Sequence, residues 1–421
     1  AVSLLIATGE IDEDAVRDTV IIGELMLSGH IGGIRGVLPI VRYARESGLK
    51  RCIIPSANAK EGAVIDGIEI IGVHELNELI DYLKGTKELK AESPCADAFN
   101  ETCPFTENDL KDVQGQKTVK RGLEIAAAGM HNVIMTGPPG TGKSMLARCL
   151  TGILPPLTID ESLEVSSIYS VAGLLPENEG LIKERRFISP HHTVTDVALI
   201  GGGISPRPGL ISLAHRGVLF LDEMPEFSKR SLEVLRQPLE ENVVHVARNN
   251  YSCDYPSDVM LVGALNPCPC GMYPDLSKCS CTVSMRKSYM ARLSKPLLDR
   301  MDICMQVTRP KSSEIIYKKE NESSLLVRER VIRAHKIQEE RFKGTGILHN
   351  SRMSAADTDK YCRVDNDLKQ YLEDAFVRFD LSARSYYRIL KVARTIADLD
   401  GSGEILKRHI SEALFYKCVI P

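Results

Sequence analysis

The run Gly137-Pro138-Pro139-Gly140-Thr141-Gly142-Lys143-Ser144 constrains this 421-residue chain more than any other feature. Glycines at this spacing followed by Lys-Ser form a phosphate-binding loop, in which backbone N–H groups converge on the phosphates, the lysine reaches the β- and γ-phosphates and the serine hydroxyl ligates Mg²⁺. The residues from His131 to Thr136 are typical of a buried strand, and those from Ser144 to Leu150 are typical of a helix. The run therefore predicts a strand, a phosphate loop and a helix whose N-terminus favours anions.

A second motif supplies the acidic residues that nucleotide hydrolysis needs. The apolar run from Val218 to Leu221 predicts a buried strand that ends at Asp222 and Glu223, at the carboxyl edge where open α/β sheets bind ligands. We expect Asp222 to hold Mg²⁺ with Ser144, and Glu223 to orient and activate the attacking water. An acidic turn in solvent is the alternative. The two motifs together predict an ATPase with ATP and Mg²⁺ as cofactors.

Composition sets the class of protein. The chain is 43% hydrophobic and 26% charged, which is ordinary for a soluble globular protein, and its length allows two or three domains. No stretch is long and apolar enough to span a bilayer. The net charge of −3 argues against a globally basic nucleic-acid binder, although a local basic stripe stays open.

The cysteines and the N-terminus indicate the cellular compartment in which the protein is expected. The chain begins Ala1-Val2-Ser3, without an initiator Met or a basic region, which suggests a trimmed start rather than a signal peptide. We therefore expect a cytoplasmic protein. Twelve cysteines in a long chain without a secretory signal suggest thiols or metal ligands instead of a disulfide framework.

Four regions follow one another along the chain. Residues 1–90 alternate short helical and strand patterns, including a strand at 51–55, and predict a small α/β unit. Residues 91–108 form a polar linker. Residues 109–312 carry the nucleotide motifs on alternating strands and helices, as expected for a parallel sheet with crossover helices, and residues 313–421 predict a helical lid.

Longer motifs resemble the magnesium-chelatase-like AAA+ proteins of the ComM/YifB family. These motifs are Ser189–Thr193, Gly201–Gly203, Pro208–His215, Asn266–Gly271, Leu381–Arg388 and Val392–Leu399. The resemblance covers essentially the whole chain. It implies an α/β AAA+ P-loop core with a parallel sheet and a C-terminal helical lid.

The same resemblance assigns roles to single residues. Asn266, after the predicted strand at 259–265, occupies the sensor position that faces the γ-phosphate, although an Asn that caps a turn is the alternative. Arg300 corresponds to an arginine finger that reaches the neighbouring subunit's nucleotide, and therefore implies an obligate oligomer, expected to be a homo-hexamer. A surface pair with Asp299 or Asp302 is the alternative for Arg300.

Two further positions follow from the resemblance. Arg384 matches the second sensor, which the lid swings over the γ-phosphate, unless it is one of the charged residues that helices commonly turn to solvent. The segment from Lys111 to Gln116 resembles the one that packs on adenine, and within it Val113 is the candidate for contact with the ring.

Four cysteines form two close pairs, Cys268 with Cys270 and Cys279 with Cys281. Two pairs in a Gly/Pro-rich loop can converge on one tetrahedral Zn²⁺. The Cys-x-Cys spacing is tighter than the Cys-x₂₋₄-Cys of most structural sites. Zinc ligands and reduced thiols therefore both stay open.

The N-terminal region resembles the latter half of a Lon-type peptidase domain. The resemblance lies in the segments 22–25, 32–39 and 53–60. Where that peptidase has its catalytic lysine, this chain has Arg35, whose guanidinium cannot be deprotonated to act as a base. We therefore expect a partial, catalytically inactive domain with a structural or docking role.

The substrate of the motor is the least constrained prediction. Lys183, Arg185 and Arg186 precede Phe187 in a segment that could project cations into a ring pore, and six copies would suit sequence-independent binding to a nucleic-acid backbone. A solvated turn paired with nearby glutamates is the alternative. The family resemblance implies ATP-driven branch migration of DNA during natural transformation, with single-stranded or branched DNA as partner. No membrane partner is expected, because no stretch is long and apolar enough to span a bilayer. A chelatase-like or chaperone-like remodeller of a protein client, or a nucleotide-gated scaffold, are the other hypotheses.

Overall fold

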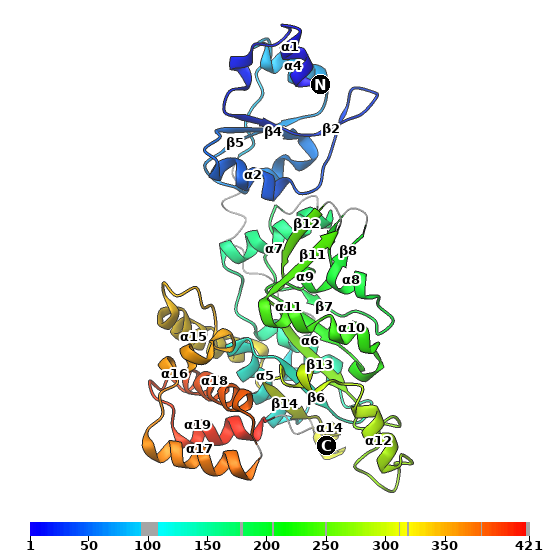
Figure 1. Ribbon diagram of the computed structural model, residues 1–421, viewed down its shortest axis with the longest axis vertical. Helices are drawn as coiled ribbons and strands as arrows, with labels where there is room; N and C mark the ends of the chain where they lie inside the picture. Colours follow the sequence, from blue (N-terminus) through cyan, green and yellow to red (C-terminus); the bar gives the residue numbers. More distant parts are fainter. Residues whose placement is uncertain are drawn as a thin grey trace. The chain divides into compact units, whose positions relative to one another are not determined.

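The computed structural model describes residues 1–93, 108–176, 180–203, 206–248, 251–310, 312–317, 320–379 and 381–417 (Figure 1). The chain divides into two compact units. Unit 1 consists of residues 1–103 and 157–184, and unit 2 consists of residues 104–156 and 185–421. Most of the predicted linker, residues 94–107, lies outside the described residues.

Unit 1 is built on a three-stranded parallel sheet in the order β1 (Thr19–Ile21), β4 (Arg51–Pro55) and β5 (Glu69–Val73). Strand β4 has the predicted bounds. Because successive side chains of a strand point to opposite faces, Ile53 and Ile54 belong to different apolar clusters, one on each side of the sheet. The other elements of this unit are α1 (Val2–Ala7), β2 (Glu24–Leu25), β3 (Ile31–Gly32), α2 (Val37–Glu46), α3 (Ala59–Gly62), α4 (Leu76–Leu83) and α7 (Ile159–Ala172).

Helix α7 belongs to unit 1 although it lies far along the chain. It begins with a capping box in which Thr158 and Glu161 bond each other's backbone N–H groups. The carbonyl oxygen of Ser170, near its end, accepts the N–H of Gly36 at 3.1 Å. Unit 1 therefore includes a helix that lies within residues 109–312, which the sequence analysis assigned to the ATPase region.

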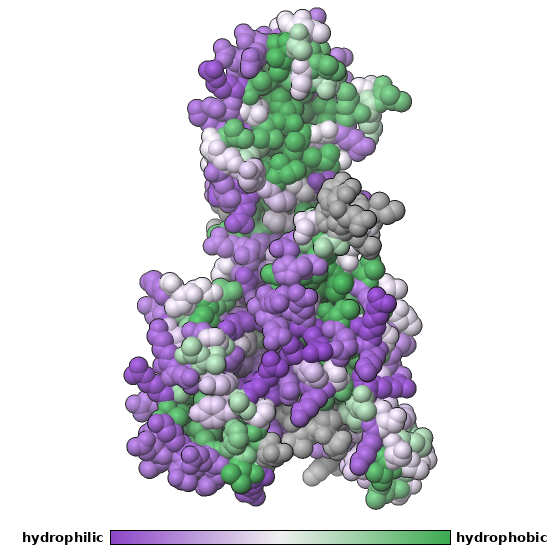
Figure 2. All heavy atoms as spheres, viewed as in Figure 1, coloured by the Kyte–Doolittle hydropathy of each residue, from purple (hydrophilic) through white to green (hydrophobic). Residues whose placement is uncertain are grey.

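The surface of unit 1 is apolar in places. On the face shown in Figure 2, apolar residues gather over this unit. The antiparallel pair β2 and β3 leads into a turn where Leu25, Met26 and Leu27 are exposed. On the same view, the visible surface of unit 2 is mostly hydrophilic.

Unit 2 contains the predicted parallel sheet. Its five strands lie in the order β14 (Ile303–Gln306), β6 (Val133–Thr136), β13 (Met260–Leu265), β10 (Val218–Leu221) and β7 (Phe187–Ile188), and every adjacent pair is parallel. β6, β10 and β13 carry the apolar runs read from the sequence, and all of β10 and β13 is buried. The α/β prediction is confirmed, with the phosphate-loop strand and the acidic strand on either side of β13.

Helices and two short hairpins surround this sheet (Figure 1). These elements are α5 (Lys117–Gly129), α6 (Lys143–Ile153), α8 (Asp196–Ile200), β8 (Gly201–Gly202), β9 (Arg207–Pro208), α9 (Leu210–Leu213), α10 (Lys229–Glu233), α11 (Arg236–Glu241), β11 (Val243–Arg248), β12 (Tyr251–Pro256), α12 (Val283–Met290), α13 (Lys295–Leu298) and α14 (Ser312–Ile316). The second half of α5, from Gly122 to Gly129, is buried in the core of the unit.

The C-terminal region is helical, as predicted. Its elements, drawn in gold to red in Figure 1, are α15 (Ser324–Phe342), α16 (Ala355–Tyr361), α17 (Asn366–Arg378), α18 (Ala383–Leu399) and α19 (Lys407–Phe415). α15 and α18 pack on α5, and their apolar residues join the same core as the sheet. The lid is therefore part of the ATPase unit.

Candidate functional site

The phosphate loop connects β6 to α6, as the sequence predicts, and two of its glycines are required by the backbone. A Cβ atom at Gly137 would lie 2.2 Å from the carbonyl oxygen of Val307, and Gly142, the N-cap of α6, has a φ of +85°. A side chain would clash at the first position and strain the backbone at the second. The first N–H groups of α6, which have no partners within the helix, follow directly and suit an anion.

Lys143 joins the phosphate loop to Asn266, the predicted sensor residue. Its Nζ donates to the carbonyl oxygens of Gly137 at 2.7 Å and Pro138 at 3.0 Å, and to Oδ1 of Asn266 at 3.1 Å. Burial lowers the pKa of Lys143, and the charges of Asp222 and Glu223 oppose that shift. Because a partly desolvated ammonium group gains from a nearby anion, this position favours a phosphate.

The acidic strand β10 ends next to the phosphate loop. Ser144 Oγ donates to Asp222 Oδ2 at 2.7 Å, and Asp222 Oδ1 accepts the N–H of Glu223 at 2.9 Å. A hydroxyl and a carboxylate with room for water and phosphate oxygens are the donor set that Mg²⁺ prefers, so these residues fit the ion. The predicted pair therefore meets at the carboxyl edge of the sheet.

Glu223 has an uncommon backbone conformation. Its φ of +48° and ψ of +45° lie in the left-handed region, which residues with a Cβ seldom adopt. Such conformations cost about 1–3 kcal/mol and are concentrated at functional sites. The exposed carboxylate of Glu223 follows Asp222 directly. The strain is consistent with a side chain held for a purpose other than packing.

Arg300 and Arg384 meet at Glu240, on α11. Arg300 Nη1 donates to the carbonyl oxygen of Pro296 at 2.6 Å and its Nη2 pairs with Glu240 Oε2, while Arg384 Nη2 lies 3.3 Å from Glu240 Oε1. Their ion pairs in the described residues go to Glu240 and not to the phosphate loop. Among the described residues, Arg300 therefore pairs with Glu240 and not with Asp299 or Asp302, and the second-sensor role of Arg384 stays a prediction.

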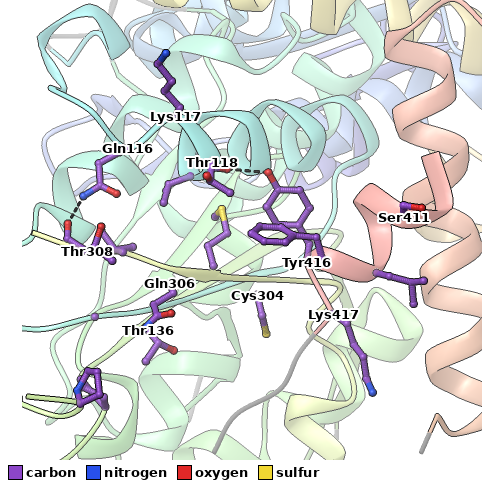
Figure 3. Close-up of a pocket in the computed structure, with 18 of the residues that line it drawn as sticks. Gln116, Lys117, Thr118, Thr136, Cys304, Gln306, Thr308, Ser411, Tyr416 and Lys417 are labelled. Atoms are coloured by element: carbon purple, nitrogen blue, oxygen red, sulfur yellow. Dashed lines mark hydrogen bonds between the residues drawn. The ribbon is translucent and has the colours of Figure 1, made fainter. Parts of the chain in front are cut away.

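A cavity of about 1530 Å³ opens beside the phosphate loop. It is larger than the ~300–1,000 Å³ of typical ligand pockets, so it has room for a nucleoside. Gly137 and Pro138 form part of its wall, and Figure 3 shows Gln116 and Thr118, at the start of α5, on another side. Tyr416 OH donates to the carbonyl oxygen of Thr118 at 2.8 Å and so joins the end of the lid to α5.

Family models match nearly the whole chain. The model described as magnesium chelatase, subunit ChlI, matches residues 109–315, its C-terminal counterpart matches residues 321–417, and a third, described as subunit ChlI of Mg-chelatase, matches residues 1–58.

Several curated proteins are similar over the full length of this chain. YifB of Salmonella typhimurium is 39% identical over 420 residues, which cover 100% of this chain and 81% of the relative. Competence protein ComM of Haemophilus influenzae is 38% identical over 426 residues, which cover 100% of this chain and 82% of the relative. The chain belongs to the magnesium-chelatase-like AAA+ family of ComM and YifB. Magnesium-chelatase subunit ChlI of Cyanidium caldarium is more distant, with 27% identity over 194 residues that cover 41% of this chain and 54% of the relative.

Membership of the ComM/YifB family implies nucleotide and Mg²⁺ use, but the ring contact predicted for Val113 stays a prediction. Val113 is 8% exposed and packs in the core of unit 2, and it is not among the residues that line the cavity. Gln116, three residues later, does line it, and its Nε2 donates to the carbonyl oxygen of Thr308. Gln116 has a φ of +55°, a left-handed conformation that the sequence alone does not predict.

The basic segment after α7 is divided between the two units. Lys183 belongs to unit 1, and Arg185 and Arg186 belong to unit 2. Arg185 donates to the carbonyl oxygens of Pro155 at 2.7 Å and Arg216 at 2.7 Å, and to that of Pro156 at 3.3 Å. These bonds give Arg185 a structural role, and the nucleic-acid contacts of the segment stay a prediction.

The four predicted thiols come together. Atoms of Cys268, Cys270, Cys279 and Cys281 that could bind a metal all lie within 4.8 Å of one another. They lie in the loop between β13 and α12, directly after Asn266. The arrangement is a candidate metal centre next to the nucleotide site.

Arg35 packs on a helix end. A Cβ atom at Gly173, the C-cap of α7, would lie 2.6 Å from Arg35 Nε, so the guanidinium lies across the helix end. This contact is compatible with the structural role expected for the N-terminal region.

Across the described residues, no helix has both the length and the apolar character that a bilayer crossing requires.

Proposed function

We propose that the chain hydrolyses ATP in a ring of identical subunits and uses the energy to move on DNA, as a ComM-like helicase or translocase that promotes branch migration. The observation that carries the hydrolytic part is the meeting of Lys143 with Asn266 and of Ser144 with Asp222 at one edge of the sheet. Four residues from three strand ends supply the groups that phosphoryl transfer requires.

Each group has a distinct task in this proposal. Lys143 binds the β- and γ-phosphates in place of the carbonyl oxygens that it contacts, and Asn266 orients the γ-phosphate end of the nucleotide. Ser144 and Asp222 would hold Mg²⁺, which supplies charge neutralisation at the phosphates. Glu223 orients and activates the attacking water. The cavity bordered by Gln116 and the lid takes the nucleoside.

The assembly follows from the two arginines. Arg384 is 50% exposed and Glu240 is 55% exposed, whereas Arg300 is 11% exposed. The carboxylate that holds both arginines is therefore open to solvent, and another anion can replace it. A neighbour's γ-phosphate is such an anion, and an arginine that reaches it contributes about 10³–10⁵ in rate. This supports an oligomer in which each site is completed by the next subunit; a hexamer is our proposal for its size, and the cytoplasm for its location.

DNA is the proposed substrate because of the family. A relative that is similar over the whole of this chain is named a competence protein. The family resemblance found in the sequence points to DNA branch migration. A chelatase-like or chaperone-like remodeller of a protein client is the second candidate, favoured by the matches to the magnesium-chelatase models.

One experiment separates these functions. ATP hydrolysis is measured with no DNA, with single-stranded DNA and with branched DNA, over a series of salt concentrations, with Glu223→Gln protein as the blank. A DNA motor is stimulated by DNA, and the stimulation falls steeply as salt rises. Robust basal turnover that no DNA stimulates would overturn the DNA proposal and direct attention to protein clients.

Two variants test the site itself. Lys143→Ala is expected to lose nucleotide binding, whereas Glu223→Gln is expected to bind ATP and lose turnover by about 10²–10⁴ because the group that acts on water is gone. Binding is followed with a fluorescent nucleotide. Normal turnover by Glu223→Gln would contradict the assignment.

A further inference from the structure

We propose that Cys268, Cys270, Cys279 and Cys281 bind one structural Zn²⁺ ion, and that this ion holds the loop after β13 against the phosphate loop. The first part is independent of the nucleotide chemistry, and the second part rests on the proposed ATP site.

The distances fit a single ion. Cys268 Sγ lies 3.4 Å from Cys270 Sγ and 3.8 Å from Cys279 Sγ, and the Sγ atoms of Cys270 and Cys279 are 3.7 Å apart. Since Zn–S bonds are about 2.3 Å long, four tetrahedral sulfurs around one zinc lie about 3.8 Å from one another. Four protein ligands leave no open position, which is the arrangement of structural rather than catalytic zinc.

The backbone around the sulfurs supplies hydrogen-bond donors. The N–H groups of Met272, Cys281 and Cys270 donate to the sulfurs of Cys270, Cys279 and Cys281, respectively. Hydrogen bonds of this kind orient metal ligands and offset the negative charge that four thiolates place on one ion. Three of the four sulfurs therefore have a backbone N–H donor of the kind that orients metal ligands.

The loop also needs a constraint of this kind. Residues 266–282, which lie between β13 and α12, contain no helix or strand. Segments of this length without secondary structure are uncommon in compact domains unless they carry a function. A metal that ties the two ends of the segment together gives it a defined shape, which reduced thiols alone would not provide.

The loop contacts the nucleotide site directly. Gly271 has a φ of +76°, and a Cβ atom there would lie 2.6 Å from Cδ of Pro139 in the phosphate loop and 3.8 Å from Cγ of Asn266. Pro267 and Tyr273, on either side of the first cysteine pair, line the cavity beside the phosphate loop. A metal-fixed loop would therefore keep Asn266 and one wall of the cavity in place.

Metal content is the direct test. The full chain, purified under reducing conditions without added metal, is expected to contain one zinc per chain by elemental analysis. Cys270→Ser and Cys279→Ser are expected to lose it, and Cys253→Ser, which changes a half-buried cysteine on β12, is expected to keep it. Cobalt substitution should give the absorption bands of a tetrahedral tetrathiolate site.

Three results would overturn the zinc site. They are a metal-free chain that does not bind Zn²⁺ on titration, a chain that contains iron instead of zinc, and a disulfide among these cysteines in the freshly purified protein. Each of these readouts is independent of ATP hydrolysis, so a failure of the proposed function would leave the test of zinc intact.

Gly271→Ala tests the contact with the phosphate loop. This variant keeps all four thiols, so it is expected to retain zinc while nucleotide affinity falls by about tenfold to a hundredfold through displacement of the loop. Gly344→Ala is the matched control, since Gly344 has a φ of +77° but no atoms within 4 Å of an added Cβ. Equal nucleotide affinity of Gly271→Ala and wild type, or no binding by wild type, would overturn the coupling.

Discussion

Asp258 and Glu240, both in unit 2, each form ion pairs with two arginines, but the carboxylate of Asp258 is buried and that of Glu240 is open to solvent. Asp258 is 11% exposed and accepts hydrogen bonds from Arg216 at 2.7 Å and from Arg352 at 2.8 Å. Arg352 comes from the lid region, whereas Asp258 lies just before β13. Because a buried charge that loses its partner is costly, this cluster ties the lid to the sheet.

Glu240 holds Arg300 and Arg384 with the same chemistry in a different setting. Glu240 is 55% exposed and Arg384 is 50% exposed, so the ion pair between them contributes about 0–1 kcal/mol and is easily exchanged. The difference in burial indicates that a carboxylate paired with two arginines serves two purposes in this unit. The Asp258 cluster is buried and complete within the chain, whereas the Glu240 cluster has a carboxylate and an Arg384 that are open to solvent, with Arg300 itself 11% exposed.

The largest expected effect is on the exposed side. Arg300→Ala is expected to lower turnover by about 10³ or more, because an arginine finger acts on the transition state, and to leave nucleotide binding unchanged. Turnover and nucleotide affinity are measured on the same preparation. Arg408→Ala, which removes an arginine that is 65% exposed and paired with Asp400, is the control and should be neutral. A parallel loss of affinity or folding would make Arg300 a structural residue.

The next effect is on the buried side, where stability rather than turnover should change. Asp258→Asn leaves Arg216 and Arg352 without their charged partner and is expected to cost about 3–5 kcal/mol of folding stability. The midpoint of urea unfolding, followed by circular dichroism, measures this cost. Turnover per folded molecule should stay near the wild-type value. If stability is unchanged, the contrast with Glu240 disappears.

Acid should weaken the buried cluster in a defined pH window. Burial lowers the pKa of His349 to about 4, although Asp258, 3.6 Å away, opposes the shift. An unfolded histidine takes up a proton near pH 6.5, so the folded state is favoured above that pH and loses up to about 3 kcal/mol as the pH falls from 6.5 to 4.

The pKa of Asp258 adds to this loss at lower pH. Burial opposes its ionisation, but His349, Arg352 and Arg216 outweigh burial and hold the pKa well below its usual range. Its contribution is therefore present above about pH 4 and is lost below that. Urea unfolding at several pH values measures both effects. A His349→Gln variant should show a flatter profile between pH 6.5 and 4, and an unchanged slope would rule out His349 as the source.

The smallest effect is expected from Glu240→Gln. Removing an exposed carboxylate that competes for Arg300 and Arg384 should change the protein concentration needed for half-maximal turnover by about two- to fivefold, in favour of assembly, since such pairs contribute up to about 1 kcal/mol. Glu241→Gln, at the adjacent position, is the matched control. A stability loss as large as that of Asp258→Asn would mean that the two clusters are alike.

Much of the sheet and the phosphate site could be predicted because the signals are local. The run Val218–Leu221 is apolar throughout and forms β10 with the predicted bounds, followed at once by Asp222 and Glu223. The contact between Lys143 and Asn266 follows from their places after two adjacent strands. Strand edges and motif spacing carry this information without tertiary detail.

The sequence did not predict which residues far apart along the chain lie next to one another in the fold. Arg384 and Glu240 are 144 residues apart, and neither has a pattern that would single it out from other charged helix residues. Helix α7 has a clear capping box, but capping defines a helix end and not the core that the helix joins. The sequence also did not decide whether the four thiols come together, since the spacing of the cysteines does not fix the distances between their sulfurs.

The most direct test of a nucleotide site shared between subunits is a mixing experiment with Arg300→Ala and Lys143→Ala chains, each of which is expected to be inactive alone. If Arg300 completes a neighbour's nucleotide site, a mixed assembly contains interfaces with an intact phosphate loop from one variant and an intact arginine from the other. We predict that the mixture regains part of the wild-type ATP turnover once fluorescently labelled subunits show co-assembly. A co-assembled mixture with no more turnover than the two separate variants would contradict a site shared between subunits.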